Sequence, residues 1–400
     1  MADAKNFLLR LGVSSESENP YKEAIDTMKR YCKDIDITDK DLIRAAVVDC
    51  LRGKKNRRDV RSLMSRYGTV DAIVVMMQEE IRARNLRLKP MWYTHKADGS
   101  SGKIRRIGIQ DIKQQLYDYV AVYALRPLFV RIGEYQCAAI PGRGQIYGLK
   151  AIKKWLRNPS IKYACKLDIR HCYESVDRGR LMGFLRRHIK NDDLLWLIQT
   201  LIDTFDKGLS IGSYLSQYLC NLYLSELYHE IAENTYKLRG KKRGCKRVNL
   251  VRHVLFYMDD ILLLGTSAKD MNAAARRVIT KAAEMGLEIK PSWRTFRIAD
   301  TREDRGGFID MMGFRFYRKY ITIRSRVFLR LRRAFLRARR RQVLCLRAAQ
   351  RCIAYFGFVL HTSSFTIAHR YKVYKAIKKA KEVISRESKI SRSAAAGAIS

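Results

Sequence analysis

The stretch His253-Val-Leu-Phe-Tyr-Met-Asp-Asp-Ile-Leu-Leu-Leu-Gly265 places two adjacent carboxylates between two apolar runs. Both runs have the length and continuity typical of strands that are covered on both faces, so they predict a hairpin with Met258-Asp259-Asp260 as its turn. Aspartate is a common turn residue, which is the simplest explanation of the pair. Adjacent carboxylates repel each other unless a cation lies between them, so a metal site is the alternative. A third carboxylate would favour the metal site.

A candidate for that third carboxylate lies upstream, in a predicted strand over Tyr163–Ile169 that has Asp168 near its end. If this strand neighbours the hairpin in one sheet, Asp168 meets Asp259 and Asp260. Three converging carboxylates suit two Mg²⁺ ions about 3.5–4 Å apart, which activate an attacking hydroxyl and bridge a triphosphate. This is the chemistry of a nucleotide polymerase.

The composition indicates a folded protein with a polyanionic partner. The 400 residues are 47% hydrophobic, and 80 Lys and Arg against 39 Asp and Glu give a net charge of +41. A chain this basic is expected to bind nucleic acid. Apolar runs such as Ala72–Met77 are far shorter than the ~20 residues of a membrane span, and the N-terminus has no apolar signal region. We therefore expect a cytoplasmic protein without a membrane partner. The nine cysteines contain no CxxC pair, so neither a disulfide framework nor a zinc site is indicated.

The pattern along the chain predicts several further elements. Helical spacing is found at residues 59–65, 70–84 and 112–129, a strand is predicted at 104–109, and strands and helices alternate from about 162 to 319. Residues 326–341 predict an amphipathic helix with eight arginines, of which Arg330, Arg333 and Arg337 are candidates for nucleic-acid contact. A solvated face or a membrane-surface helix are the alternatives for this helix. Residues 14–20 are predicted to form a mobile loop and residues 388–400 a disordered tail.

At this point the residues resemble a known family. Phe256-Tyr-Met-Asp-Asp260 resembles the YxDD box of reverse transcriptases, and Asp168 with Tyr173 five residues later resembles their first catalytic motif. The resemblance implies that Asp168, Asp259 and Asp260 are catalytic and bind two Mg²⁺ ions, with Ile169 as a further metal ligand. It also implies that Tyr173 excludes a 2′-hydroxyl and so selects dNTPs, and that Tyr257 and Met258 lie next to nucleic acid.

Other motifs follow in the order expected for this family, over about Arg105 to Phe316. The strand with Lys103, Arg105 and Arg106 resembles the one that grips the incoming triphosphate. Residues 140–145, Ile-Pro-Gly-Arg-Gly-Gln, resemble the family's glycine-bearing segment. Residues 287–295 resemble the next palm motif, with Arg294 where many relatives carry lysine, and arginine is poorly suited to donate a proton. Residues 312–316 resemble the primer grip, which implies that Gly313 contacts nucleic acid.

The resemblance implies an α/β fold class, with an α+β palm, in a right-hand polymerase. We expect an N-terminal helical segment over residues 1–85, fingers over 86–160, a palm over 161–320 and a basic helical thumb with a tail over 321–400. The palm is expected to be an antiparallel sheet backed by helices.

One sequence motif differs from the corresponding motif of most reverse transcriptases, which is Gln-Gly-x-x-x-Ser-Pro. Here Ser210-Ile-Gly-Ser-Tyr-Leu-Ser-Gln217 has Ile211 in place of Gln and Gln217 in place of Pro. This form, together with residues 290–294, 308–316 and 355–361, is similar to reverse transcriptases of diversity-generating retroelements. Ile211, Gly212 and Gln217 are then expected to lie at the dNTP, and removal of a hydrogen-bonding side chain there offers a route to low fidelity.

That branch implies a bacterial or phage-encoded enzyme that makes cDNA from a template-repeat RNA, with errors opposite adenines, during mutagenic retrohoming. Its partners would be the template RNA, the primer, the cDNA and a small basic accessory protein that forms a ring. The alternatives are another bacterial reverse transcriptase, of the antiphage-defence or maturase-like kind, a non-catalytic RNA-binding relic of a polymerase, or an RNA-copying RNA polymerase. We expect neither an endonuclease nor an RNase H domain in this sequence.

Overall fold

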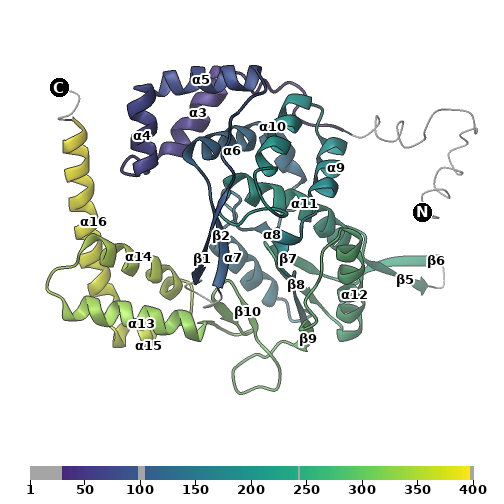
Figure 1. Cartoon of the computed structure of the whole chain (residues 1–400). Coiled ribbons are helices and arrows are strands. Elements are labelled where there is room, and N and C mark those ends of the chain that lie inside the picture. The colour runs from purple at the N-terminus through teal and green to yellow at the C-terminus, as the bar shows by residue number, and fades with distance from the viewer. Residues whose placement is uncertain (1–28, 98–103, 242–243, 397–400) are drawn as a thin grey trace, which may run out of the picture.

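The computed structural model of the chain describes residues 29–97, 104–241 and 244–396 (Figure 1). The loop predicted at residues 14–20 lies outside these ranges. The first described helices are α3 (Lys40–Leu51), α4 (Arg58–Tyr67) and α5 (Val70–Arg82), which confirms the two helices predicted here.

The next segment is a two-stranded antiparallel ribbon followed by helix. Strand β1 (Trp92–Ala97) pairs with β2 (Ile104–Ile109), and α6 (Ile112–Ala124) follows. The sequence predicted one helix as far as Phe129, but the α-helix ends at Ala124 and a 3-10 helix, η1, covers Arg126–Arg131. Pro127 explains the change, because proline lacks an N–H and disfavours helical geometry in the residue before it.

A five-stranded sheet forms the centre of the molecule, in the order β3-β7-β8-β4-β9. Its strands are β3 (Gln136–Cys137), β4 (Tyr163–Asp168), β7 (His253–Tyr257), β8 (Asp260–Gly265) and β9 (Arg294–Arg297). Strands β7, β8, β4 and β9 pair antiparallel, as expected, whereas β3 pairs with β7 in parallel. The expectation of a purely antiparallel sheet is therefore wrong at this edge.

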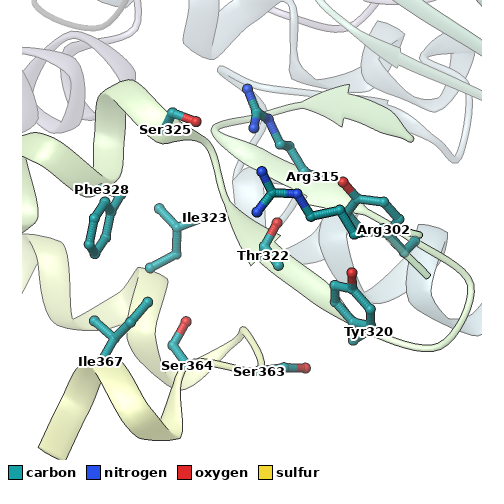
Figure 2. Close-up of a pocket in the computed structure, with 11 residues that line it drawn as sticks. Arg302, Arg315, Tyr320, Thr322, Ile323, Ser325, Phe328, Ser363, Ser364 and Ile367 are labelled. Atoms are coloured by element: carbon teal, nitrogen blue, oxygen red, sulfur yellow. The ribbon is translucent and has the colours of Figure 1, made fainter. Parts of the chain in front are cut away.

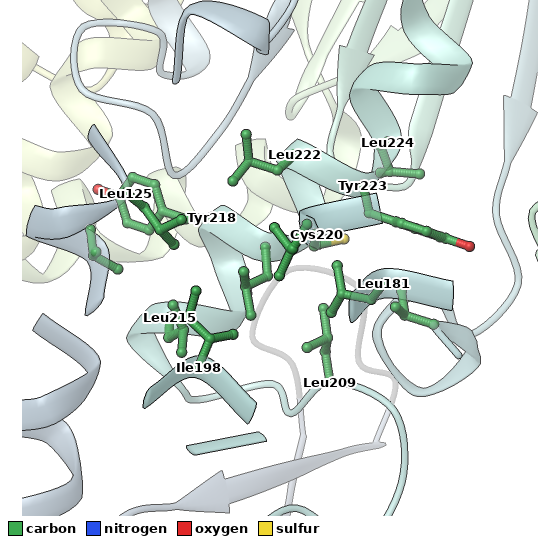
Figure 3. Close-up of a cluster of buried hydrophobic side chains, with 14 of the residues drawn as sticks. Leu125, Leu181, Ile198, Leu209, Leu215, Tyr218, Cys220, Leu222, Tyr223 and Leu224 are labelled. Carbon is green, nitrogen blue, oxygen red and sulfur yellow. The ribbon is translucent and has the colours of Figure 1, made fainter. Parts of the chain in front are cut away.

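Helices α7 to α12 accompany this sheet: α7 (Gln145–Leu156), α8 (Cys172–Ser175), α9 (Arg178–His188), α10 (Asp192–Ile202), α11 (Tyr214–Glu233) and α12 (Ala268–Glu284). Helix α11 is buried around most of its circumference between Leu215 and Tyr228, as expected for a helix whose apolar residues are not confined to one stripe. Figure 3 shows Leu215, Cys220, Leu222 and Leu224 pointing away from α11 in different directions into the surrounding core. The main core is therefore built around α11.

Two smaller sheets and a helical unit complete the described chain. Strands β5 (Tyr236–Lys241) and β6 (Gly244–Asn249) form a separate ribbon, and β10 (Ile309–Met311), β11 (Phe314–Phe316) and β12 (Ile321–Ile323) form a three-stranded sheet. The C-terminal helices are α13 (Ser325–Arg340), α14 (Leu346–Leu360), α15 (Phe365–Arg370) and α16 (Val373–Ala396).

The C-terminal helices have a core of their own, to which α13 contributes Val327, Leu331 and Phe335. The amphipathic helix predicted here is thus confirmed. The disordered tail predicted from residue 388 is wrong as far as Ala396, because α16 continues to that residue. Residues 394–396 are alanines, which have the highest intrinsic helix propensity and extend the preceding helix.

Asp118 is a buried carboxyl group that joins α6 to the start of α11. Its Oδ2 accepts hydrogen bonds from Gln110 Nε2, Ser213 Oγ and the Leu215 backbone N–H, at 2.9, 2.7 and 3.2 Å. Ser213 is itself the N-cap of α11. Asp118 therefore fixes both the helix N-terminus and the turn at residues 210–213 that precedes it.

Burial raises the pKa of Asp118 to about 6, although the hydrogen bonds from Ser213 and Gln110 act to lower it. Folding thus favours the protonated form relative to an unfolded chain, in which an aspartate pKa is about 3.9. The resulting stabilisation is complete below pH ~4 and is lost as the pH rises through about 6. A shift of this size corresponds to roughly 3 kcal/mol.

We expect Asp118→Asn to remove this pH dependence, because Asn can keep an accepting oxygen at the Oδ2 position but does not titrate. The stability advantage of the wild type over the variant, as the difference of their free energies of unfolding, should fall by roughly 2 kcal/mol between about pH 4.5 and 7.5. Urea unfolding at several pH values measures this difference. Asp39→Asn, at the exposed N-cap of α3, is the control and should show little change. Parallel pH curves for wild type and Asp118→Asn would contradict the assignment.

Candidate active site

Strand β4 and the β7–β8 hairpin bring Asp168, Asp259 and Asp260 to the same end of the central sheet. Asp168, the last residue of β4, lies directly opposite Asp260, the first residue of β8. The Ile169 backbone N–H donates a 3.0 Å hydrogen bond to the Asp259 carbonyl oxygen. The predicted neighbourhood of the strands is confirmed. The turn is shorter than predicted, because Asp260 already pairs with Tyr257 and only Met258 and Asp259 remain in the loop.

The electrostatic environment of Asp259 disfavours its ionised form. Burial raises the pKa of this carboxyl group, and the carboxylates of Asp260 and Asp168 raise it further, whereas Arg105 lowers it. The three acidic groups thus lie close enough to repel one another. A cation placed among them would lower the pKa of Asp259 and relieve the repulsion.

Two lysines neutralise part of this negative charge. Lys166 Nζ lies 3.1 Å from Asp260 Oδ1 and donates a 2.9 Å hydrogen bond to the Asp310 carbonyl oxygen. Lys290 Nζ forms an ion pair with Asp168 Oδ1. Within residues 29–97, 104–241 and 244–396, no group of three His, Cys, Asp or Glu side chains is arranged to hold a metal ion. Two of the three carboxylates, Asp168 and Asp260, are thus paired with ammonium groups.

The Met258–Asp259 turn has an unusual backbone that α11 supports. Met258 has a positive φ of 54°, a conformation that costs a non-glycine residue ~1–3 kcal/mol. Asn221 Nδ2, on α11, lies 3.2 Å from Met258 Sδ and 2.9 Å from the Gln217 carbonyl oxygen. The Met258 backbone N–H also donates to the Cys137 carbonyl oxygen of β3, at 3.4 Å. The position of Asp259 thus depends on contacts from β3 and α11.

Tyr173 lies on the four-residue helix α8 and is half-buried. Burial raises the pKa of its hydroxyl, Asp259 raises it further, and Arg105 lowers it. Its carbonyl oxygen accepts a 2.8 Å hydrogen bond from the Leu209 backbone N–H, which ties α8 to the segment before α11. Tyr173, Arg105 and Asp259 therefore lie within electrostatic range of one another, although they come from three separate elements.

The β1–β2 ribbon contacts the turn that holds Ile211 and Gly212. The Gly108 backbone N–H donates a 2.7 Å hydrogen bond to the Ile211 carbonyl oxygen. Gly212 has a φ of 119°, and a Cβ atom at this position would collide with the Gly108 carbonyl oxygen. Glycine is therefore required at position 212, and the half-buried Ile211 is held against β2.

Arg105 and Arg106, both predicted to bind triphosphate, have different surroundings. Arg105 acts electrostatically on Asp259 and Tyr173. Arg106 forms an ion pair with Asp206, and its guanidinium lies 3.8 Å from the ring centroid of Tyr93. Consecutive residues of a strand point to opposite faces, which explains the difference. The structure thus places Arg105 within electrostatic range of Asp259 and gives Arg106 other partners. Lys103 lies outside the described residues.

Three further predicted residues lie on neighbouring elements of the sheet or on α11. Tyr257 is directly opposite Asp260, and burial raises the pKa of its hydroxyl. Arg294 is exposed on β9, opposite Lys166 of β4. Gln217 is half-buried on the first turns of α11. Contact of these side chains with nucleic acid or a dNTP stays a prediction.

Gly313 occupies the turn between β10 and β11, where its φ is 82°. A Cβ atom here would meet the ring of Phe358 on α14, so the glycine allows the turn to contact the C-terminal helices closely. Gln145 Nε2, from the glycine-bearing segment, donates a hydrogen bond to the Met312 carbonyl oxygen. Two segments that the sequence singled out separately are therefore joined at this turn.

Cationic side chains continue from this turn towards α13. Figure 2 shows a hollow between the β10–β12 sheet and the C-terminal helices, where Arg302 and Arg315 lie near Tyr320 and Thr322. Arg330, Arg333 and Arg337 lie on α13 outside its buried stripe, where Arg333 and Arg337 are exposed and Arg330 is half-buried. This region is thus rich in groups that bind phosphate.

Four residues that support the site were not predicted from the sequence: Lys166, Lys290, Asn221 and Asp118. Lys166 was detectable, because it precedes Asp168 by two residues and so points to the same face of the strand. Lys290, Asn221 and Asp118 reach their partners only through the fold, and no local pattern marks them.

No helix in the described part of the chain is both long enough and apolar enough to span a membrane.

Comparison with known proteins agrees with this geometry. Residues 94–359, more than half of the chain, match the family model described as reverse transcriptase (RNA-dependent DNA polymerase). None of the curated proteins compared with the chain matches it. The matched segment contains the three aspartates, Tyr173 and the Ile211 turn, and the family has the palm-type fold of nucleotide polymerases, in accord with the mixed helix and sheet seen here. The chain therefore belongs to the reverse transcriptase family of RNA-dependent DNA polymerases.

Proposed function

We propose that this protein copies RNA into DNA and that Asp168, Asp259 and Asp260 hold two Mg²⁺ ions for the reaction, with Ile169 as a further ligand. The pairing of Asp168 with Asp260 across β4 and β8, with Asp259 in the adjoining turn, is the observation that carries the proposal. Carboxylate oxygens are ligands that Mg²⁺ prefers, and the mutual repulsion of these groups favours a bound cation.

When bound, such ions lower the pKa of an attacking hydroxyl and stabilise the leaving phosphate oxygen. The residues of the chain then have distinct tasks. Arg105 offers positive charge to the triphosphate, and Tyr173 contacts the sugar and excludes a 2′-hydroxyl. Lys290 would release Asp168 if a metal ion were bound there, and Lys166 would remain beside Asp260.

We further propose that the four regions given above correspond to the subdomains of a right-hand polymerase. Residues 86–160 act as fingers, 161–320 as the palm and 321–400 as the thumb, after an N-terminal segment of residues 1–85. The separate core of α13–α16 and the arginine-rich surface of α13 support the thumb assignment. Template RNA, primer and cDNA would lie between fingers and thumb, with Tyr257, Met258, Arg294, Gly313, Arg330, Arg333 and Arg337 among the contacts.

The proposal extends to error-prone cDNA synthesis in a diversity-generating retroelement. It is supported by the apolar Ile211, held against β2 by the Gly108 hydrogen bond, at a position where most of the family has a polar side chain. Gly212 and Gln217 would complete this part of the dNTP pocket. The template would be a repeat RNA, and the small basic ring protein of that branch would be the partner.

Asp259→Asn should abolish DNA synthesis, by on the order of 10³-fold or more, because one metal-binding charge is lost. RNA affinity should change little, since phosphate contacts dominate it. The measurement is extension of a DNA primer on a defined RNA template with Mg²⁺ and dNTPs, with RNA binding measured in parallel.

Asp192→Asn, an exposed aspartate in the first turn of α10, is the matched control for Asp259→Asn and should keep full activity. If wild type does not extend the primer, the proposed activity is wrong. An equal loss of synthesis and RNA binding in Asp259→Asn would mean that Asp259 is structural.

Ile211→Gln should lower misincorporation opposite template adenines roughly tenfold or more, because a hydrogen-bonding side chain next to the new base pair can contribute ~1–3 kcal/mol of discrimination. Sequencing of the cDNA measures the error spectrum. Ile211→Leu keeps an apolar side chain and should preserve the wild-type spectrum. Unchanged errors in Ile211→Gln would rule out this role for the residue.

Lys290→Gln should strengthen Mg²⁺ binding by about three- to tenfold, since the ion no longer competes with an ammonium group for Asp168. Isothermal titration of the protein with Mg²⁺ alone gives the affinity without relying on catalysis. Lys153→Gln, on an exposed position of α7, controls for the loss of one charge. Mg²⁺ binding in Lys290→Gln that is no stronger than in this control would refute the competition.

A further inference from the structure

The β5–β6 ribbon, residues 236–241 and 244–249, stands apart from the rest of the structure. Its two strands pair with each other in register and belong to no larger sheet. Figure 1 shows the ribbon beyond α12, on the opposite side of the molecule from α13–α16. A two-stranded ribbon is at best marginally stable by itself, so its persistence needs anchoring or a partner.

One face of the ribbon carries positive charge that the protein does not neutralise. Arg239 lies directly opposite Lys246, and both are exposed. Like charges in this arrangement repel and destabilise the strand pair. Among the described residues, neither forms an ion pair with a carboxylate, whereas Lys237 on the same face is bound to Asp270 of α12 at 2.6 Å. A bound polyanion would neutralise both side chains and so remove the repulsion between them.

The other face combines an aromatic ring, an apolar side chain and a guanidinium. Tyr236 is 39% and Leu238 65% exposed, so large apolar groups face the solvent here. The Arg247 guanidinium lies 3.6 Å from the ring centroid of Tyr236. Aromatic rings with adjacent arginines form the stacking surfaces with which proteins bind unpaired bases. Both faces of the ribbon thus fit nucleic acid.

The base of the ribbon is fixed to the body of the protein. The Lys237–Asp270 ion pair joins it to α12, and the Leu250 backbone N–H donates a 3.0 Å hydrogen bond to the Thr235 carbonyl oxygen. The ribbon therefore holds Arg239, Lys246 and Arg247 in a defined position outward from α12.

We propose that the β5–β6 ribbon binds the backbone of an RNA segment outside the region between the proposed fingers and thumb, namely template RNA that is not paired with the primer. This proposal depends on the proposed function only because that function identifies the ligand as RNA. Binding itself requires no DNA synthesis. The ribbon and α13–α16 lie on opposite sides of the molecule, so the ribbon would hold RNA independently of a primer–template duplex at α13–α16 (Figure 1).

The test compares Arg239→Gln/Lys246→Gln with wild type, using two substrates that share one primer. The first is a short primer–template duplex, and the second has the same duplex at the end of a long RNA. The double variant should lose roughly tenfold affinity for the long RNA. The slope of log K against log salt concentration should become shallower by about 1.5, as expected for two lost phosphate contacts. Affinity for the short duplex and extension on it should not change.

A matched control is Arg186→Gln/Lys190→Gln, which removes two exposed cations four residues apart at the end of α9. Arg239→Lys/Lys246→Arg keeps the charges and should retain wild-type affinity. An equal loss in the α9 control would show a diffuse effect of net charge and overturn the proposal. So would an equal loss on the short duplex, or no loss on the long RNA. Primer extension on the short duplex tests the polymerase assignment separately.

Discussion

The mutual repulsion of three carboxylates at one end of the central sheet is the constraint on which the rest of the site depends. Pairing of β4 with β8 places Asp168 opposite Asp260, and the tight turn adds Asp259. Backbone hydrogen bonds of the sheet hold the charges together. Lys166 of β4, Lys290 of the segment before β9 and Arg105 of β2 then supply positive charge. Carboxylates that the backbone holds together against this repulsion favour the binding of a cation.

Helix α11 connects the turn that holds Asp259 to the proposed nucleotide pocket. Asn221 contacts the strained turn at Met258, and the N-terminus of the same helix is fixed by the buried Asp118. The turn with Ile211 and Gly212 lies between that N-terminus and β2. Helix α11 is close-packed over most of its surface, so a displacement at one of these contacts is expected to affect the other. Fidelity and catalysis are therefore expected to depend on one rigid element.

The large positive charge is distributed unevenly over the surface. Part of it is neutralised by ion pairs, as at Arg106 and Lys237, and part lies along α13 and on the β5–β6 ribbon. Phosphate contacts at two separate places would let the protein hold a long RNA while its end is copied. This also makes binding strongly dependent on salt, since each contact releases counterions.

The sequence by itself determined the strand–turn–strand unit around Asp259, the strand that ends at Asp168, the amphipathic helix near residue 330 and the resemblance to reverse transcriptases. These features follow from apolar periodicity and from spacing within short segments, which the chain carries locally. Tertiary structure alone decided that Lys290 binds Asp168, that Asp118 lies beneath the Ile211 turn, that Arg105 rather than Arg106 lies near the carboxylates, and that β3 is parallel. Each of these depends on strand order and on which faces pack together, so residues far apart in the sequence meet only when the whole chain has folded.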